Sequence, residues 1–261
     1  MHPSRISGIN QLEKHEKPAM YTRLIPTPLK EKFNLRDDFY DEHGNSLLKL
    51  HALKGGSMAE MYLYHRYDAQ DPVLYGQITD TLNGQIHIML YVINDPDSPR
   101  FNVDRMSDGT PTAFGVLRRN IEAEVQAMQA GLAPGQIRSG LRMLSASAKV
   151  FEDFSTLLGH DRYFTEPLYY HNAIILERAG FAYQRGRRLM EQINAGFAPG
   201  GELAARLDGS TPFRMPQAAE SIRLRSWALH DGLLGEPFAN VTMYKIVGSH
   251  AGVSTVSEIN W

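Results

Sequence analysis

Alternating apolar and polar positions in the first half of the chain predict an antiparallel sheet. Residues 58–67 alternate in this way, residues 73–81 form a second candidate strand, and residues 85–94 are almost entirely apolar, which is typical of a central strand. Asn83 and Gly84 separate the last two segments, and this dipeptide favours a type I′ hairpin turn. The pattern therefore predicts a meander of three antiparallel strands.

The pattern changes to a helical period after residue 110. Thr110 and Pro111 can begin a helix whose apolar face runs from Leu117 to Met128 at spacings of three and four residues. Residues 137–158 repeat the same spacing. We therefore expect two long helices that follow the strands.

A third pattern combines a strand, a polar corner and a short helix. Residues 162–169 predict a strand, Asn172 can cap a helix over residues 173–179, and Gly180 ends that helix. Phe181 then opens the next strand.

The rest of the chain is mainly helical. Two further helices are predicted at residues 189–197 and 216–231, and a last strand at residues 241–247.

Strands that come first and helices that come later predict an α+β fold, with an antiparallel-to-mixed central sheet packed by helices. We expect an N-terminal arm over residues 1–45, an α+β core over residues 46–184, and a helical C-terminal extension with a final strand over residues 185–261. The polar, proline-containing arm reads as an extended segment. It could pack on the body or on a second subunit, and the second arrangement would give a homodimer.

Composition narrows the classes of partner. The chain has 261 residues, 43% hydrophobic and 21% charged, with a formal net charge of −2. The chain has no strong electrostatic field that would favour nucleic acid or an anionic membrane, so we expect neither as a partner. We expect a small-molecule ligand. The absence of cysteine excludes disulfides and thiolate chemistry. A polar N-terminus and short apolar runs predict a cytoplasmic location.

A glycine- and proline-containing turn at residues 131–140 precedes the second long helix. Helix N-termini bind phosphates, because their unpaired N–H groups and the helix dipole both attract anions. Gln136, Arg138, Ser139 and Gly140 are therefore candidate phosphate-binding residues. The alternative is a tight turn between helices with solvated arginines.

Two segments resemble a known superfamily in order and spacing. They are Gln136-Ile-Arg-Ser-Gly-Leu and Asn172-Ala-Ile-Ile-Leu-Glu-Arg-Ala-Gly-Phe181. Over about residues 58–184 the chain resembles the GNAT superfamily of N-acetyltransferases. The resemblance implies an acetyltransferase-like core that binds acetyl-CoA or another acyl-CoA, with the pyrophosphate on the Gln136 turn and Asn172 also at the cofactor site. Leu176 stands where many members have a tyrosine that acts as general acid.

Glu166, Tyr170 and His171 are the candidate catalytic residues, because they gather near one turn. A carboxylate and an imidazole can deprotonate an amine, and a tyrosine hydroxyl can protonate a leaving thiolate. These residues make an acyl-CoA-dependent N-acyltransferase the leading hypothesis. In the alternative interpretation, Glu166 forms an ion pair with an arginine, while His171 and Asn172 together cap a helix.

Other functions stay open at this point. His171 and His230 could hold a divalent metal or haem, if the fold brings them together with a carboxylate. A noncatalytic binding or scaffold protein of the same fold is also compatible with Leu176.

Overall fold

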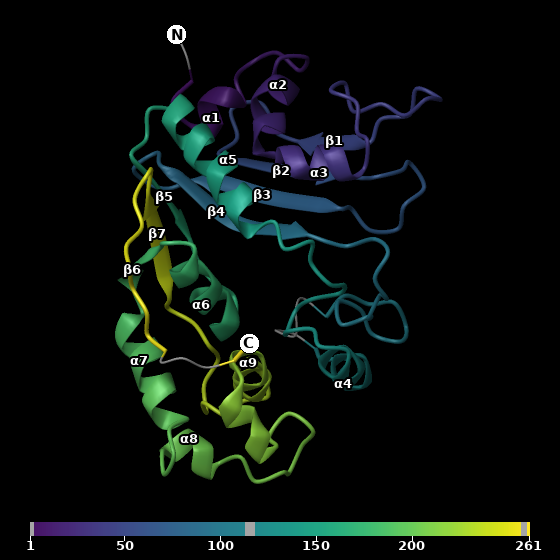
Figure 1. Cartoon of the computed structure of the whole chain (residues 1–261). Helices are drawn as coiled ribbons and strands as arrows, with labels where there is room; N and C mark the ends of the chain where they lie inside the picture. Colours follow the sequence, from purple (N-terminus) through teal and green to yellow (C-terminus); the bar gives the residue numbers. More distant parts are fainter. Residues whose placement is uncertain (1–2, 113–117, 257–259) are drawn as a thin grey trace. The chain divides into compact units, whose positions relative to one another are not determined.

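The computed structural model describes residues 3–112, 118–256 and 260–261. Its strands form a mixed sheet in the order β1-β2-β3-β4-β5-β7-β6, with helices packed around it, so the α+β prediction is confirmed (Figure 1). The strands are β1 Leu48–His51, β2 Met58–Leu63, β3 Leu74–Asp80, β4 Ile86–Ile93, β5 Arg162–Thr165, β6 Ala182–Arg185 and β7 Thr242–Ile246.

The helices precede, interrupt and follow the strands. They are α1 Ile6–Ile9, α2 Lys17–Tyr21, α3 Thr27–Lys32, α4 Ile121–Gln129, α5 Leu144–Leu157, α6 Tyr170–Arg178, α7 Arg187–Gly196, α8 Glu202–Ala205 and α9 Ile222–His230, with 3-10 turns η1 Thr22–Leu24 and η2 Pro216–Glu220.

The chain forms two compact units, and each is discontinuous in sequence. The first unit comprises Met1–Pro96, Gly140–Glu166 and Tyr244–Ala251. The second unit comprises Asp97–Ser139, Pro167–Met243 and Gly252–Trp261.

Strands β1 to β4 of the first unit form an antiparallel meander, in which β2 to β4 are the three predicted strands and β1 is a fourth that the pattern does not predict. Because successive side chains point to opposite faces, Met61 of β2, Gly76 of β3 and Tyr91 of β4 share one face, which we call the covered face. Glu60 of β2 and Gln77 of β3 share the other, which we call the open face. The buried positions of β2 fall on the covered face.

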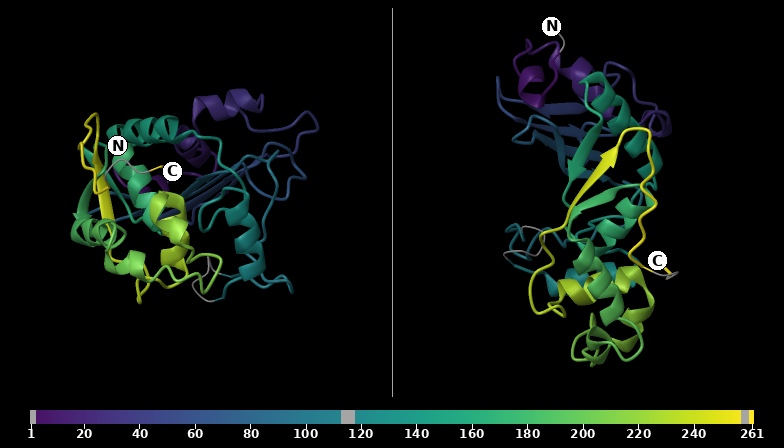
Figure 2. Two further views of the ribbon diagram at one scale, coloured as in Figure 1. Left: turned by 60° about the horizontal axis from the view of Figure 1, so that its bottom comes forward. Right: turned by 90° about the vertical axis from the view of Figure 1, so that its left-hand side faces the viewer.

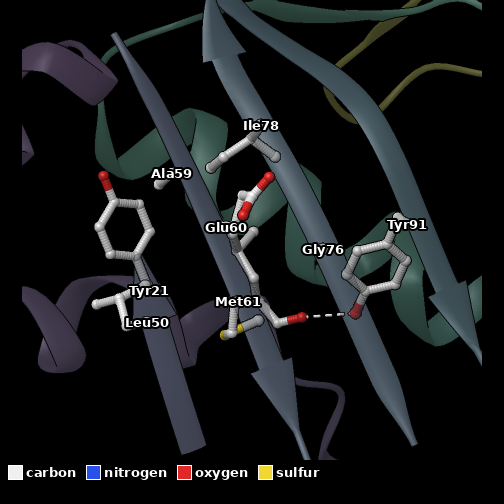
Figure 3. A pocket seen from close by; sticks show the side chains of 9 residues that line it. Tyr21, Leu50, Ala59, Glu60, Met61, Gly76, Ile78 and Tyr91 are labelled. Carbon is white, nitrogen blue, oxygen red and sulfur yellow. Dashed lines mark hydrogen bonds between the residues drawn. The ribbon is translucent and has the colours of Figure 1, made fainter. Parts of the chain in front are cut away.

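Helix α5 and the N-terminal turns pack on the covered face (Figure 2). Tyr91 meets Phe151 of α5 edge to face at 4.9 Å, and its hydroxyl donates to the Leu24 carbonyl at 2.6 Å. Figure 3 shows the small hollow on this face, with Tyr21 at one end and Tyr91 at the other. Aromatic burial therefore fixes the covered face of the sheet.

The N-terminal segment is helical rather than an extended arm. The backbone N–H groups of Ile6 and Ser7 donate to the Asp80 carboxylate at 2.7 and 2.9 Å, which caps α1 from the end of β3. Ile6 and Ile9 are fully buried. The segment therefore packs on the sheet of its own unit, because its short apolar patches find a core there.

The hairpin between β3 and β4 is confirmed, but the predicted turn type is wrong. Thr81 N–H donates to the Gln85 carbonyl at 2.8 Å, which leaves a three-residue loop. Gly84 has a φ of +76°, whereas Asn83 is not among the described residues with positive φ. A type I turn followed by a left-handed glycine has this pattern.

Two helices begin later than the periodicity predicts. Helix α4 starts after Asn120, whose side chain accepts from Ala123 N–H at 3.2 Å, and not at Thr110. Leu117, the first residue of the predicted apolar face, lies outside the described residues. Helix α5 starts at Leu144, because a φ of +56° at Arg142 interrupts the helical backbone.

The predicted helix over residues 216–231 is two elements. Pro216 opens the 3-10 turn η2, and α9 begins separately after Ser221, whose hydroxyl accepts from Leu224 N–H at 3.3 Å.

The second unit has its own core around Trp227 of α9. The Trp227 ring stacks on Phe213 at 5.2 Å, and its indole N–H donates to the Leu132 carbonyl at 2.8 Å. This bond satisfies the polar atom of the most deeply buried aromatic side chain in the unit.

Candidate functional site

A break in strand pairing marks the candidate site in the first unit. Within the described residues, β5 pairs in parallel with β4 only at His87↔Phe164 and Ile88↔Thr165. On the other side of β4 the register with β3 shifts, so that Met89 is an extra residue. A β-bulge of this kind bends the strand and re-aims its groups.

The break leaves a gap along one edge of β4. The gap runs from Met89 to Ile93, between the last pair with β5 and the isolated bridge Asn94↔Gly140. Asn94 N–H donates to the Val73 carbonyl at 2.9 Å, so alternation directs the N–H and C=O of Tyr91 away from β3 and into the gap. An extended ligand that carries amide groups can pair with such an edge.

His87 and Glu166 lie beside this gap. Burial lowers the pKa of His87, and the nearby Glu166 carboxylate opposes that effect. His87 Nε2 is buried and has no hydrogen-bond partner within the described part of the chain. Glu166 is exposed directly after β5. A neutral imidazole beside a carboxylate can accept a proton.

The predicted phosphate turn does not open a helix. Gln136 closes its own turn, because its side-chain oxygen accepts from Ala133 N–H at 2.7 Å. Arg138 donates to the Ser98 carbonyl, and Ser139 N–H donates to the Ser98 hydroxyl at 3.1 Å. These contacts hold the turn within the second unit.

Gly140 belongs to the first unit and bridges to Asn94. A Cβ atom at Gly140 would lie 3.3 Å from the Ile93 carbonyl oxygen, so glycine permits close approach to the end of β4.

The start of α5 offers different phosphate-binding groups. Arg142 is exposed and forms no ion pair with any residue that the structure describes. The N-cap residue Met143 makes no side-chain bond to the first turn, so the first backbone N–H groups of α5 stay available.

Tyr170 and His171 begin α6 in the second unit, whereas Glu166 ends a segment of the first. His171 is fully enclosed; its Nδ1 lies 2.9 Å from the Ser226 hydroxyl, and burial lowers its pKa to about 3. Burial raises the pKa of Tyr170, with Arg225 opposing the rise. His171 therefore has a structural role in its own unit, whereas the Tyr170 hydroxyl is buried without a hydrogen-bond partner among the described residues.

Asn172 lies inside the first turn of α6 and does not cap it. The residue before the helix is Tyr169, and the Asn172 amide contacts His171 Nε2 at 3.2 Å. The prediction of an Asn172 cap is therefore wrong, because the helix begins earlier than expected.

His171 and His230 both contact the Tyr169 ring, His171 by stacking at a centroid distance of 5.7 Å and His230 edge to face at 5.5 Å. His230 Nε2 contacts Glu124 at 3.3 Å. Burial alone would raise the pKa of Glu124, but hydrogen bonds from His230 and Arg119 outweigh it and lower that pKa. No group of three metal-ligating side chains occurs in the described ranges. The metal alternative gains no support from these contacts.

Comparisons with protein-family models, with curated proteins and with solved structures found no match. Among the helices that the structure describes, none is long and apolar enough to cross a bilayer.

His87 is the site residue that sequence patterns miss. A single histidine in an apolar strand reads as an ordinary strand position, and only the pairing of β4 with β5 brings it to Glu166. The bulge at Met89 has no signal in the sequence, because neither glycine nor proline marks it.

Proposed function

We propose that this chain is an acyl-CoA-dependent N-acyltransferase whose reaction takes place beside the β4 gap. The gap itself is the observation that carries the proposal, since it combines backbone groups of Tyr91 that point away from β3 with the unpaired ring nitrogen of His87 and with Glu166. The resemblance to N-acetyltransferases over part of the chain points the same way.

The residues of the first unit fit an acyl-CoA in two respects. The backbone of Tyr91 can pair with the amides of the pantetheine arm, as a strand edge does with an extended peptide. Arg142 and the first turn of α5 can bind the pyrophosphate. Acyl-CoA supplies an acyl group activated as a thioester. The phosphate site thus moves from the Gln136 turn to Arg142.

His87 is the proposed general base. Its neutral imidazole accepts the proton that the amine loses as the new C–N bond forms and the C–S bond breaks. Glu166 attracts the protonated amine, which loses one proton to solvent before it attacks, and Glu166 then stabilises the imidazolium that forms when His87 accepts the second proton. The leaving thiolate takes its proton from solvent.

Binding of CoA and of pantetheine tests the proposal. CoA should raise the melting temperature of the whole chain, because a ligand that binds only the folded state stabilises it. Arg142→Ala should weaken CoA binding about tenfold through the loss of a charged contact, and leave pantetheine binding unchanged. Arg36→Ala removes an exposed arginine elsewhere in the first unit and should change neither. A flat response to CoA would contradict the proposal.

A second experiment tests catalysis. It measures transfer of the acetyl group from acetyl-CoA to a panel of primary amines, and release of the free thiol of CoA reports the rate. His87→Gln should lower the rate by about 10² or more and keep CoA binding. Wild-type protein that binds CoA and releases no thiol with any amine would instead be a noncatalytic binding protein.

A further inference from the structure

Glu60 lies at the middle of β2 and points to the open face of the sheet (Figure 3). Its carboxylate receives a long hydrogen bond from each of three side chains. The hydroxyls of Tyr62 and Tyr75 donate at 3.4 Å, and the amide of Gln77 donates at 3.2 Å. All three donors are neutral.

The Glu60 carboxylate is half-buried and forms no ion pair with any of the described residues. A partly buried carboxylate normally lies beside a cation, because loss of hydration is costly without one. Long bonds from neutral donors only partly offset that cost. The side chain therefore offers a negative charge to a cation from outside the described chain.

Two aromatic rings flank this charge. The centroids of Tyr62 and Tyr75 are 4.8 Å apart with an angle of 55° between the rings, so their faces are not stacked on each other. His51 of β1 meets Tyr62 edge to face at 5.7 Å and extends the aromatic surface. Ring faces next to a carboxylate attract ammonium groups through cation–π contacts.

On the same face, the ammonium group of Lys49 already makes a cation–π contact with a tyrosine ring. Lys49 of β1 is opposite Tyr62 in the register, and its Nζ lies 4.9 Å from the ring centroid of Tyr64. The tyrosines of this face are thus accessible to cations, while Lys49 itself leaves Glu60 without a charged partner.

We propose that Glu60, Tyr62 and Tyr75 form a binding site for a small organic ammonium ion, with Glu60 as counterion and the rings as walls. Gln77 positions the carboxylate. The site goes beyond acyl transfer and does not depend on it, because no group of the β4 gap takes part.

Choline and its neutral isostere, in which carbon replaces the quaternary nitrogen, are the probes. They have nearly the same shape, so only charge separates them. Ligand-observed NMR of the full chain should show an upfield shift of the choline methyl signal, from the ring currents of the tyrosines, and a response to the isostere at least about tenfold weaker. Equal responses to both probes would overturn the proposal.

Glu60→Gln should weaken choline binding about tenfold or more. The melting temperature of this variant reports whether the variant folds. Glu31→Gln, at an exposed position of α3, makes the same change in net charge and should leave binding intact. Retained binding in folded Glu60→Gln would overturn the proposal. If Glu60→Gln does not fold, a comparison of two variants at Tyr62 tests the proposal instead. Tyr62→Phe keeps the ring and should bind choline, Tyr62→Leu should not, and equal binding by both would refute the site.

Discussion

Hydrogen bonding separates His171 from His87, although both have buried ring nitrogens. Both ring nitrogens of His171 have neighbours, Ser226 on one side and Asn172 on the other, and no solvent reaches them. His87 keeps a free nitrogen and lies near the Glu166 carboxylate. A base needs a ring nitrogen that no neighbour already occupies, so His87 suits that role and His171 suits the packing of α6.

The depressed pKa of His171 predicts a loss of stability in acid. A histidine in the unfolded chain has a pKa of about 6.5, and burial lowers that of His171 to about 3. Between these values the unfolded state takes up a proton and the folded state does not. The free energy of unfolding should therefore fall as the pH falls, by on the order of 5 kcal/mol at pH 3.

Urea unfolding from pH 7 to pH 4 checks this prediction. His171→Gln should show a flatter pH dependence than the wild type, whatever its stability at pH 7. His43→Gln, at an exposed loop position, should keep the wild-type slope. Parallel curves for the wild type and His171→Gln would contradict the assignment.

Sequence patterns located one side of the candidate site. Glu166 was predicted because it follows a recognisable strand with aromatic neighbours. Tyr170 and His171 follow it closely in sequence, yet the boundary between the two units falls directly after Glu166. Proximity in sequence overstated their relation, since a chain that leaves a strand can enter another unit within one residue.

At the scale of elements, strands were easier to predict than helix starts. The Asn83-Gly84 signal locates the ends of β3 and β4 almost to the residue, and the almost continuous apolar run of residues 85–94 marks β4 as a central strand. Apolar spacing also continues through residues 137–143, which are not helical. One left-handed residue, Arg142, delays the start of α5 to Leu144 without disturbing the apolar pattern.

The turn between β3 and β4 gives a prediction that distinguishes two loop geometries. In a type I′ turn both central residues need positive φ, whereas here only Gly84 has it. Gly84→Ala should cost about 1 kcal/mol or more, and the added Cβ would also lie 2.4 Å from the Arg5 side chain. Asn83→Ala should cost clearly less, because Asn83 needs no left-handed backbone.

Chemical denaturation of the two single variants measures these costs directly. Ser210→Ala, in another surface loop, serves as a control for loop substitutions in general. A cost for Asn83→Ala that equals the cost for Gly84→Ala would favour the type I′ turn and refute the observed loop.

At the scale of the whole molecule, the fold class was predictable and the division into units was not. Strands followed by helices indicate α+β packing whatever the connections. The chain, however, passes from one unit to the other after Pro96, Ser139, Glu166, Met243 and Ala251. None of these points is a linker by composition, so a search for flexible linkers along the sequence cannot find them.

Because the chain passes repeatedly between the two units, we predict that both units unfold together. Strand β7 spans Thr242–Ile246, and the boundary after Met243 cuts it, so the order of one unit cannot be lost without disturbing a strand that serves the other. Both tryptophans, Trp227 and Trp261, report on the second unit. A dye on Glu31→Cys reports on the first, since the chain has no other cysteine.

The two signals should share one midpoint in denaturant, as two-state unfolding requires. Arg119→Ala makes the test stricter, because it removes the cation that the buried Glu124 carboxylate and the half-buried Asp231 carboxylate share. Asp231 keeps Arg214 and Glu124 keeps His230, so we expect this change in the second unit to cost about 1–3 kcal/mol and to move both midpoints equally. A shift of the tryptophan signal alone would show that the units fold independently, in spite of the strand that runs across their boundary.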